Sequence, residues 1–168
     1  MIDPHPSVLR LWRAYCTATD RAPATPCPPA WHFCDNEADA NELAALVCAG
    51  VKRATTPSVW ELEAAGCPLP EPGDLNIVTT WDGIAQCIIR TTDVEVVSFD
   101  AVTAAHAAGE GEGDGSLAYW RRTHWAYYQR VLADTPHTPS PDMPVVCEHF
   151  EGVHVVSDAH LKHTAPPP

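Results

Sequence analysis

Long apolar runs are missing from this sequence of 168 residues. No stretch approaches the roughly 18 consecutive apolar residues that a membrane-spanning helix needs. The N-terminal segment, MIDPHPSVLRLWRAY, also lacks the basic start and continuous apolar stretch of a secretory signal peptide. We therefore expect a cytoplasmic protein with no membrane partner. With 45% hydrophobic residues, the chain can bury the core of one compact domain.

Closely spaced cysteine pairs are missing too. The seven cysteines are scattered and odd in number, and no two of them are spaced as C-x-x-C. This pattern favours reduced thiols over a disulfide framework or a structural zinc site. The nearest approach to a ligand pair is His160-x-x-His163, in a proline-terminated tail of the kind that is usually solvated. We therefore predict no metal and no cofactor.

Cations are scarce: ten Lys and Arg stand against 22 Asp and Glu, for a net charge of −12. Affinity for duplex DNA comes mainly from cations that neutralise phosphates, so we expect no duplex DNA partner. A small pocket with a local cationic lining remains compatible with this charge. Only two of the ten cations are lysines, Lys52 and Lys162. This scarcity makes Lys52, which stands beside Arg53, a candidate functional residue.

The chain divides into three parts. Apolar residues at helical spacing predict an amphipathic helix over 6–19, and four prolines then make 21–29 a loop or extended crossing. We assign residues 1–30 to this helix and crossing, residues 31–156 to the main domain, and residues 157–168 to a disordered tail.

A second helix is predicted to begin at Asp35 or Asn36, whose side-chain oxygens can cap it. Gly50 is placed to end this helix, because glycine readily adopts the positive φ of a helix C-terminus. Lys52 and Thr55 would then lie just beyond the helix, at an edge of the domain.

Two β-rich runs, LNIVTTW and IAQCIIRTTDVEVVSF, flank the dipeptide DG and predict a hairpin. A short helix capped by Ser98 or Asp100 should follow and run through Ala105, and a longer helix should begin at Ser116. One or two closing strands are predicted over 145–156. Short strands interrupted by helices, without regular β-α-β alternation, favour an α+β fold with a small barrel or curled sheet.

Lys52 and Thr55 form a candidate base and nucleophile, because a hydroxyl needs a neighbour that accepts its proton. A solvated lysine and a turn threonine are the alternative. The acidic stretch EGEGD contains Glu110 and Glu112, which could orient a lysine or transfer protons, or simply form a solvated turn. It precedes the helix start at Ser116, where backbone N–H groups could bind an oxyanion.

Aromatic faces and cations could bind a nucleobase and its phosphate, although most of the aromatic residues should pack in the core. The candidate ligand-binding residues are Trp31, Phe33, Arg53, Ser116, Trp120 and Arg121. His106 and His149 show no partner pattern, and we assign them no role.

Four stretches of the chain, in order from Trp31 to Phe150, read WHFCDNEADANELAALVCAGVKRATT, PGDLNIVTTWDG, EGEGDGSLAYWRRTHWAYY and VVCEHF. Together they resemble the bacterial ASCH domain family, and within it the larger members. The resemblance implies a PUA-like small β-barrel with flanking helices and a cleft suited to a nucleoside or single-stranded RNA. Some family members remove the acetyl group from N4-acetylcytidine and related acylated cytosines, using a lysine, a threonine and a glutamate.

By position, the family's G-x-K-x-x-T pattern falls on Lys52 and Thr55, and its glutamate falls on Glu110 or Glu112. The larger members usually have a serine two residues after the threonine, where this chain has Pro57. This departure removes a hydrogen-bonding side chain at that position and bears on the shape of the substrate.

The resemblance leads to one main hypothesis and two alternatives. In the main one, amide hydrolysis, Thr55 attacks an acyl carbonyl, Lys52 accepts its proton, and Glu110 or Glu112 holds Lys52. The first alternative is a module that binds or cleaves RNA, since a relative by motif has been described as a ribonuclease. The second is a sensor that binds a modified nucleoside without catalysis.

Overall fold

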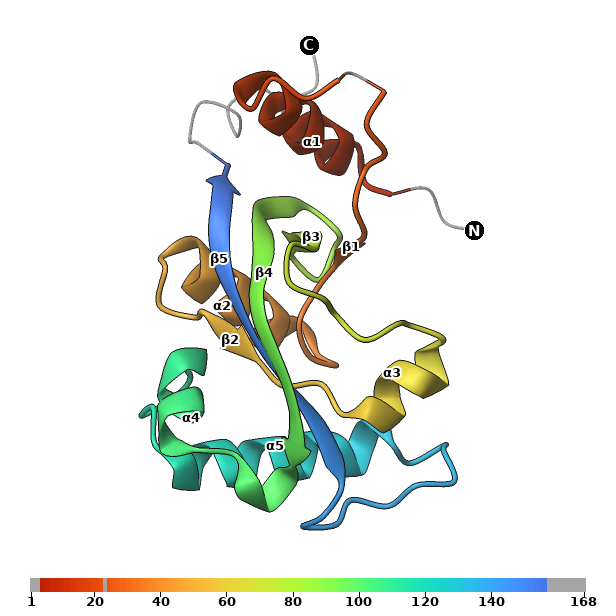
Figure 1. The fold of residues 1–168 in the computed structure, drawn as a ribbon, viewed down its shortest axis with the longest axis vertical. Helices are drawn as coiled ribbons and strands as arrows, with labels where there is room; N and C mark the ends of the chain where they lie inside the picture. The colour runs from red at the N-terminus through yellow and green to blue at the C-terminus, as the bar shows by residue number, and fades with distance from the viewer. Residues whose placement is uncertain (1–3, 23, 157–168) are drawn as a thin grey trace.

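The computed structural model describes residues 4–22 and 24–156 (Figure 1). Its elements, in chain order, are α1 (Pro6–Ala18), β1 (Ala30–Trp31), α2 (Glu37–Cys48), β2 (Ala54–Thr55), α3 (Val59–Ala65), β3 (Leu75–Thr79), β4 (Ala85–Ser98), the 3-10 helix η1 (Phe99–Ala101), α4 (Ala104–Glu110), α5 (Leu117–Val131) and β5 (Pro144–Val155). The predicted α+β class is confirmed. No helix within the described ranges is long and apolar enough to cross a membrane.

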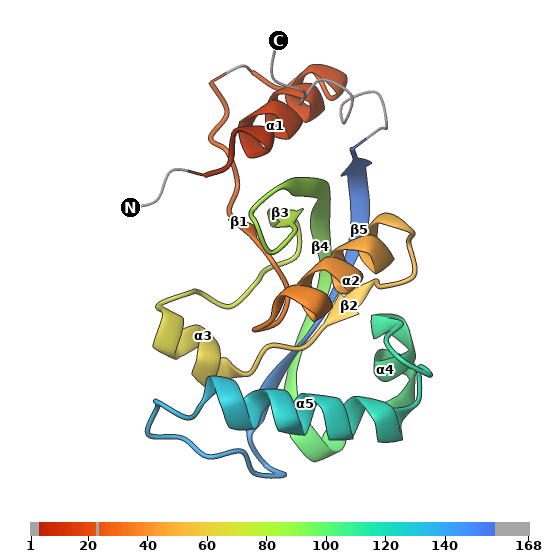
Figure 2. The ribbon, with the colours of Figure 1, turned by 180° about the vertical axis from the view of Figure 1, so that it is seen from behind.

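The sheet has five strands in the order β1-β3-β4-β5-β2. All neighbouring pairs are antiparallel except β1 with β3, which is parallel. The long strands β4 and β5 extend through the molecule, with α1 near one end and α4 and α5 near the other (Figures 1 and 2). Register shifts between Ile88 and Ile89 and between Thr91 and Asp93 mark irregularities of the bulge type, which bend a strand pair.

The predicted N-terminal helix is confirmed as α1. Pro6 occupies its first turn, where its missing N–H has no partner to lose. The helix buries a stripe that includes Leu11 and Trp12 against Ile77 and Ile88 of the sheet. The predicted tail, residues 157–168, lies outside the described residues.

The second predicted helix is also confirmed. Asn36 caps α2 by accepting a hydrogen bond from the backbone N–H of Asp39, and Gly50 follows the helix with a φ of +71°. Leu43 and Val47 pack into the same core cluster as Phe150. The chain then turns back into β2, which pairs with β5 along the edge of the sheet.

The structure corrects the helix that was expected to follow β4. Ser98 makes no capping bond, because its hydroxyl donates to Asp100 instead. The chain forms the short η1, and α4 begins only after Thr103, whose side chain accepts the N–H of His106. The helix therefore runs on through Glu110, which is its last residue and not part of a loop.

The predicted helix from Ser116 is confirmed as α5, with Ser116 as its cap. The hairpin of β3 and β4 and the closing strand β5 are confirmed as well. These elements leave a hollow between α2, α3, α5 and the sheet, and the candidate site lies there.

Candidate active site

A cavity of about 600 Å³ contains most of the residues that the sequence singled out. Its volume lies within the roughly 300–1,000 Å³ that small-molecule sites usually have. Its lining includes the predicted residues Trp31, Phe33, Lys52, Thr55, Glu110 and Glu112. The wall is mostly apolar, and its leucine and proline side chains include Leu43 of α2 and Leu62 of α3.

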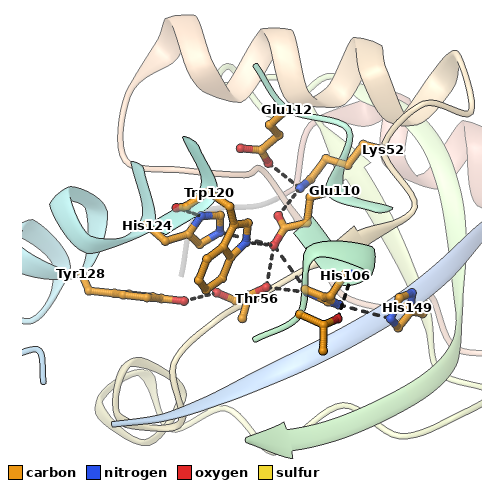
Figure 3. Close-up of polar contacts among 10 residues, drawn as sticks. Lys52, Thr56, His106, Glu110, Glu112, Trp120, His124, Tyr128 and His149 are labelled. Atoms are coloured by element: carbon orange, nitrogen blue, oxygen red, sulfur yellow. Dashed lines mark hydrogen bonds and ion pairs between the residues drawn. The ribbon is translucent and has the colours of Figure 1, made fainter. Parts of the chain in front are cut away.

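Lys52 is held between two carboxylates. Its Nζ lies 2.8 Å from Oε2 of Glu110 and 2.5 Å from Oε1 of Glu112 (Figure 3). Lys52 and Glu110 are each only 1% exposed, whereas Glu112 is 15% exposed. Glu110 is at the end of α4 and Glu112 is in the turn after it. The acidic stretch therefore supplies the ion-pair partners of Lys52 and is not a solvated loop.

The ionisation of this group follows from its contacts. Burial alone would lower the pKa of Lys52, but the two carboxylates outweigh it and raise that pKa above its ordinary value. Burial alone would likewise raise the pKa of Glu110, but the Lys52 ammonium, with smaller contributions from two histidines, holds it well below its ordinary value. These contacts favour the ammonium form of Lys52. An ammonium has no lone pair, so Lys52 could accept the proton of Thr55 only after losing one of its own, and its role as the base stays a prediction.

Glu110 is bonded through both oxygens. Its Oε1 accepts hydrogen bonds from the hydroxyl of Thr56 at 2.5 Å and from the indole Nε1 of Trp120 at 2.7 Å. The Nε2 of His124 lies 3.4 Å from the same oxygen. Trp120 is buried and is not among the residues lining the cavity, so its position supports the carboxylate and does not offer a stacking face.

A chain of hydrogen bonds continues from Glu110 through Thr56 and His106 to His149 (Figure 3). Because Thr56 donates to Glu110, its oxygen accepts from Nε2 of His106 at 2.8 Å. The Nδ1 of His106 is 3.2 Å from Nε2 of His149. Burial and the neighbouring His106 lower the pKa of His149, which favours its neutral form. The sequence reasoning missed Thr56 and both histidines; the i, i+4 spacing of His106 and Glu110 on one helix was the available signal.

Thr55 and Glu148 lie opposite each other in the antiparallel pair of β2 and β5, and both line the cavity. Glu148 is 5% exposed, and its Oε1 accepts a hydrogen bond from the hydroxyl of Thr91 at 2.6 Å. Burial is the main cause that raises the pKa of Glu148, and the nearby Asp74 adds to it. Sequence reasoning did not single out Glu148, although it lies within the stretch VVCEHF.

Two of the predicted aromatic residues lie where a planar ligand could contact them. The rings of Trp31 and Phe33 pack edge to face with centroids 4.9 Å apart, and both line the cavity. The Nζ of Lys52 lies 5.1 Å from the centroid of Phe33, a cation–π arrangement that further fixes the ammonium.

Three predicted ligand-binding residues lie elsewhere and are not among the cavity residues. Arg53 is exposed, and Arg121 is exposed and donates to the backbone oxygen of Asp100. Ser116 serves as the cap of α5. Its own N–H donates to Asp114, so this predicted oxyanion donor is already occupied.

Comparisons with known proteins bear on the family and the fold. A family model described as the ASCH domain matches residues 29–154. The structure is similar to that of the ASCH domain from Lactobacillus crispatus JV V101, with 31% identity, a TM-score of 0.81, and coverage of 90% of this chain and 96% of that one. A protein from Enterococcus faecalis V583 is similar with 27% identity, a TM-score of 0.84, and coverage of 96% and 98% respectively. No curated protein matches the chain.

Proposed function

The chain belongs to the ASCH domain family and has its PUA-like fold, and from this premise we propose that it is an amidohydrolase. Its proposed substrates are N4-acylated cytosine nucleosides, with N4-acetylcytidine as the representative. The reaction is hydrolysis of the amide that joins the acyl group to the exocyclic nitrogen of cytosine. Thr55, Lys52 and the pair Glu110 and Glu112 are the proposed catalytic group.

The observation that carries this proposal is the ammonium of Lys52, fixed between two carboxylates in the wall of a mostly apolar cavity. A charge that is already oriented costs no reorganisation when an oxyanion forms beside it, and apolar surroundings strengthen the attraction. One oriented donor of this kind is typically worth about 3 kcal/mol of transition-state stabilisation. The aromatic pair Trp31 and Phe33 offers the planar base an apolar surface.

The proposed chemistry proceeds through an acyl-enzyme. The Oγ1 of Thr55 attacks the acyl carbonyl carbon, and the carbonyl oxygen becomes an oxyanion stabilised by Lys52. The bond from this carbon to the cytosine nitrogen breaks, and the amine leaves with a proton. Water then hydrolyses the acyl ester on Thr55. Since both carboxylates hold Lys52 in its ammonium form, we propose that the proton of Thr55 passes to another group.

The test is incubation of the purified chain with N4-acetylcytidine while cytidine release is followed by chromatography. Thr55→Val removes the nucleophile, and we expect release to fall at least 100-fold without loss of the folded state, checked by thermal melting. Arg90→Met is the control, because it removes a cation from an exposed ion pair with Glu151. A wild-type chain that releases no cytidine, or a Thr55→Val variant as active as wild type, would refute the proposal.

The same cavity would also serve a protein that binds a modified nucleoside or single-stranded RNA without hydrolysing an amide. Saturable binding of N4-acetylcytidine without release would identify a sensor. RNA binding that weakens steeply with salt would identify a phosphate-driven module, whereas turnover of a neutral nucleoside should hardly change with salt.

A further inference from the structure

Thr55 and Glu148 are cross-strand partners. Residues directly opposite each other in an antiparallel pair share one face of the sheet, with Cβ atoms about 4.5–5.5 Å apart. Both residues line the same cavity, so the Thr55 hydroxyl and the Glu148 carboxylate face a common space. The pairing places a buried carboxylate on the strand opposite a hydroxyl for which the Lys52 ammonium is no proton acceptor.

A hydrogen bond from a neighbouring strand fixes one oxygen of the Glu148 carboxylate. Thr91 is 1% exposed and lies opposite Phe150, which places it on the same face of the sheet as Glu148, one diagonal away. Its hydroxyl donates to Oε1 of Glu148 at 2.6 Å. Within the described part of the chain, every fully buried side-chain nitrogen or oxygen has a hydrogen-bond partner. The second oxygen of Glu148 has none, so it retains access to the cavity that Glu148 lines.

Glu148 also differs chemically from the carboxylates around Lys52. It takes part in no ion pair among the described residues, so no cation offsets the cost of burying it. Burial therefore raises its pKa, an effect that Asp74 increases and the hydrogen bond from Thr91 partly opposes. A carboxylate whose pKa is raised toward neutrality takes up a proton more readily than an ordinary one, which is the property of a general base.

We propose that Glu148 is a further catalytic residue, the proton acceptor for the hydroxyl of Thr55. Glu148 removes the proton from Oγ1 as this oxygen bonds to the acyl carbon, and it returns the proton to the cytosine nitrogen as the carbon–nitrogen bond breaks. It then takes a proton from the water that attacks the acyl ester and returns it to Oγ1 as the acid leaves. Thr91 is a positioning residue. This inference rests on the proposed function for both its substrate and its nucleophile, and the two are tested separately below.

Other groups in the cavity bear on the titration of Glu148. The charged side chains and histidines that line the same cavity are Asp74, Glu61, Lys52, Glu110, Glu112, His32 and His124. Burial is the main cause that raises the pKa of Glu148, and Asp74 adds to it.

The experiment measures the nucleophile directly with p-nitrophenyl acetate, an activated ester that needs no cytosine recognition. Acetylation of Thr55 is quantified by peptide mass at pH values from 5 to 9, beside cytidine release from N4-acetylcytidine. For Glu148→Gln, which keeps the size of the side chain, we expect both rates to fall about 10²–10⁴-fold with KM nearly unchanged. The acid limb of the pH profile should disappear.

Thr91→Val is the second variant and distinguishes positioning from packing. It removes a hydrogen bond that favours the charged form of Glu148, so the acid limb should move to higher pH while the rate at pH 9 stays within about tenfold of wild type. Arg90→Met again serves as the control.

The outcomes separate this inference from the proposed function. If acetylation of Thr55 depends on Glu148 while N4-acetylcytidine stays intact, the proposed substrate is refuted and the role of Glu148 as the base is supported. If cytidine is released equally by wild type and Glu148→Gln, the function stands and the base is overturned. A rise in KM alone, or wild-type Thr55 that is never acetylated, would also overturn it.

Discussion

Glu110 and Glu148 are two buried carboxylates that line one cavity, yet their surroundings push their ionisation in opposite directions. Burial favours the protonated form of both. Glu110 is paired with the Lys52 ammonium and accepts two further hydrogen bonds, and its pKa is held low. Glu148 is paired with no cation in the described structure, accepts one bond from Thr91, and has a raised pKa.

The difference shows how one small cavity can hold a fixed charge and a titrating group together. The Lys52 group is satisfied internally, so it gives the cavity a permanent and oriented ammonium. The charged form of Glu148 has no counter-ion among the described residues, so burying it costs free energy of folding. The same lack of a counter-ion makes the carboxylate available for proton transfer. Variants of the two groups should therefore differ in stability, in activity and in pH dependence.

The largest expected effect comes from removing the cation. Lys52→Met leaves Glu110 and Glu112 without a counter-ion, and breaking a buried pair in this way typically costs about 3–5 kcal/mol. We expect this loss in urea denaturation at pH 7. The deficit should shrink as the pH falls toward 5, because the carboxylates left behind can take up protons in the variant but not in the wild type.

Arg90→Met is the matched control for this variant. It also removes the cation of an ion pair, but in this pair the side chains of both Arg90 and Glu151 are exposed. Exposed pairs contribute little to stability, so this variant should unfold close to the wild type. Equal losses in the two variants would contradict the fixed-charge description of Lys52.

The next effect tests the turn that carries the two glutamates. Gly111 has a φ of +66°, and a Cβ there would lie 2.7 Å from the backbone oxygen of Val51, directly before Lys52. Gly111→Ala should therefore cost about 2–4 kcal/mol, from backbone strain and overpacking together. Gly115 also has a positive φ, of +71°, but a Cβ there would meet no atom within 4 Å, so Gly115→Ala measures the backbone strain alone. Similar unfolding free energies for the two would show that the turn is not packed against Val51.

Two adjacent threonines give the next, smaller effect. Thr56 is buried and bonds both Glu110 and His106, so Thr56→Val should cost about 1–3 kcal/mol by leaving these groups without a partner. Thr55 is half-buried and makes no such bond, so Thr55→Val should change stability by about 0.5 kcal/mol or less while abolishing activity. The pair of measurements is thermal unfolding and cytidine release. A reversed pattern would make Thr56 the nucleophile.

Elements with strong local signals were predictable from the sequence. The helical spacing of Val8, Leu11 and Tyr15 identified α1. The cap at Asn36 and the glycine at Gly50 bounded α2. The start of α4 was not predictable, because Ser98, Asp100 and Thr103 are all good caps and only tertiary contacts choose among them. The assignment of residues 1–30 as a separate part stays a prediction.

The candidate site was only partly predictable. The structure brings Lys52 and Glu110, which are 58 residues apart, into direct contact, and family resemblance had indicated both. Glu148 required the strand register, which local patterns do not supply. A signal was nevertheless present: with a period of two, Glu148 shares a face with Val146 and Phe150, and all three are buried. A glutamate between two inward-facing apolar residues indicates a buried carboxylate.

The smallest expected effect separates the two carboxylates by the sign of their pH dependence. Because the pKa of Glu148 is raised above its ordinary value of 4.5, the folded state holds this proton more tightly than the unfolded state does. The contribution of Glu148 to stability is therefore full below pH 4.5 and is lost as the pH rises through the folded pKa. Glutamine has no such proton, so Glu148→Gln should avoid the loss.

Urea denaturation of wild type and Glu148→Gln at pH 4 and pH 8 measures this difference. We expect nearly equal free energies of unfolding at pH 4, and an advantage of about 1 kcal/mol for the variant at pH 8. Glu110 has the opposite effect: because its pKa is lowered, its contribution to stability is present above pH 4.5 and is lost as the pH falls. Both proteins contain Glu110, so its contribution cancels in the difference between them. A difference that is the same at both pH values would mean that Glu148 is no more titratable than Glu110, and the contrast between them would fail.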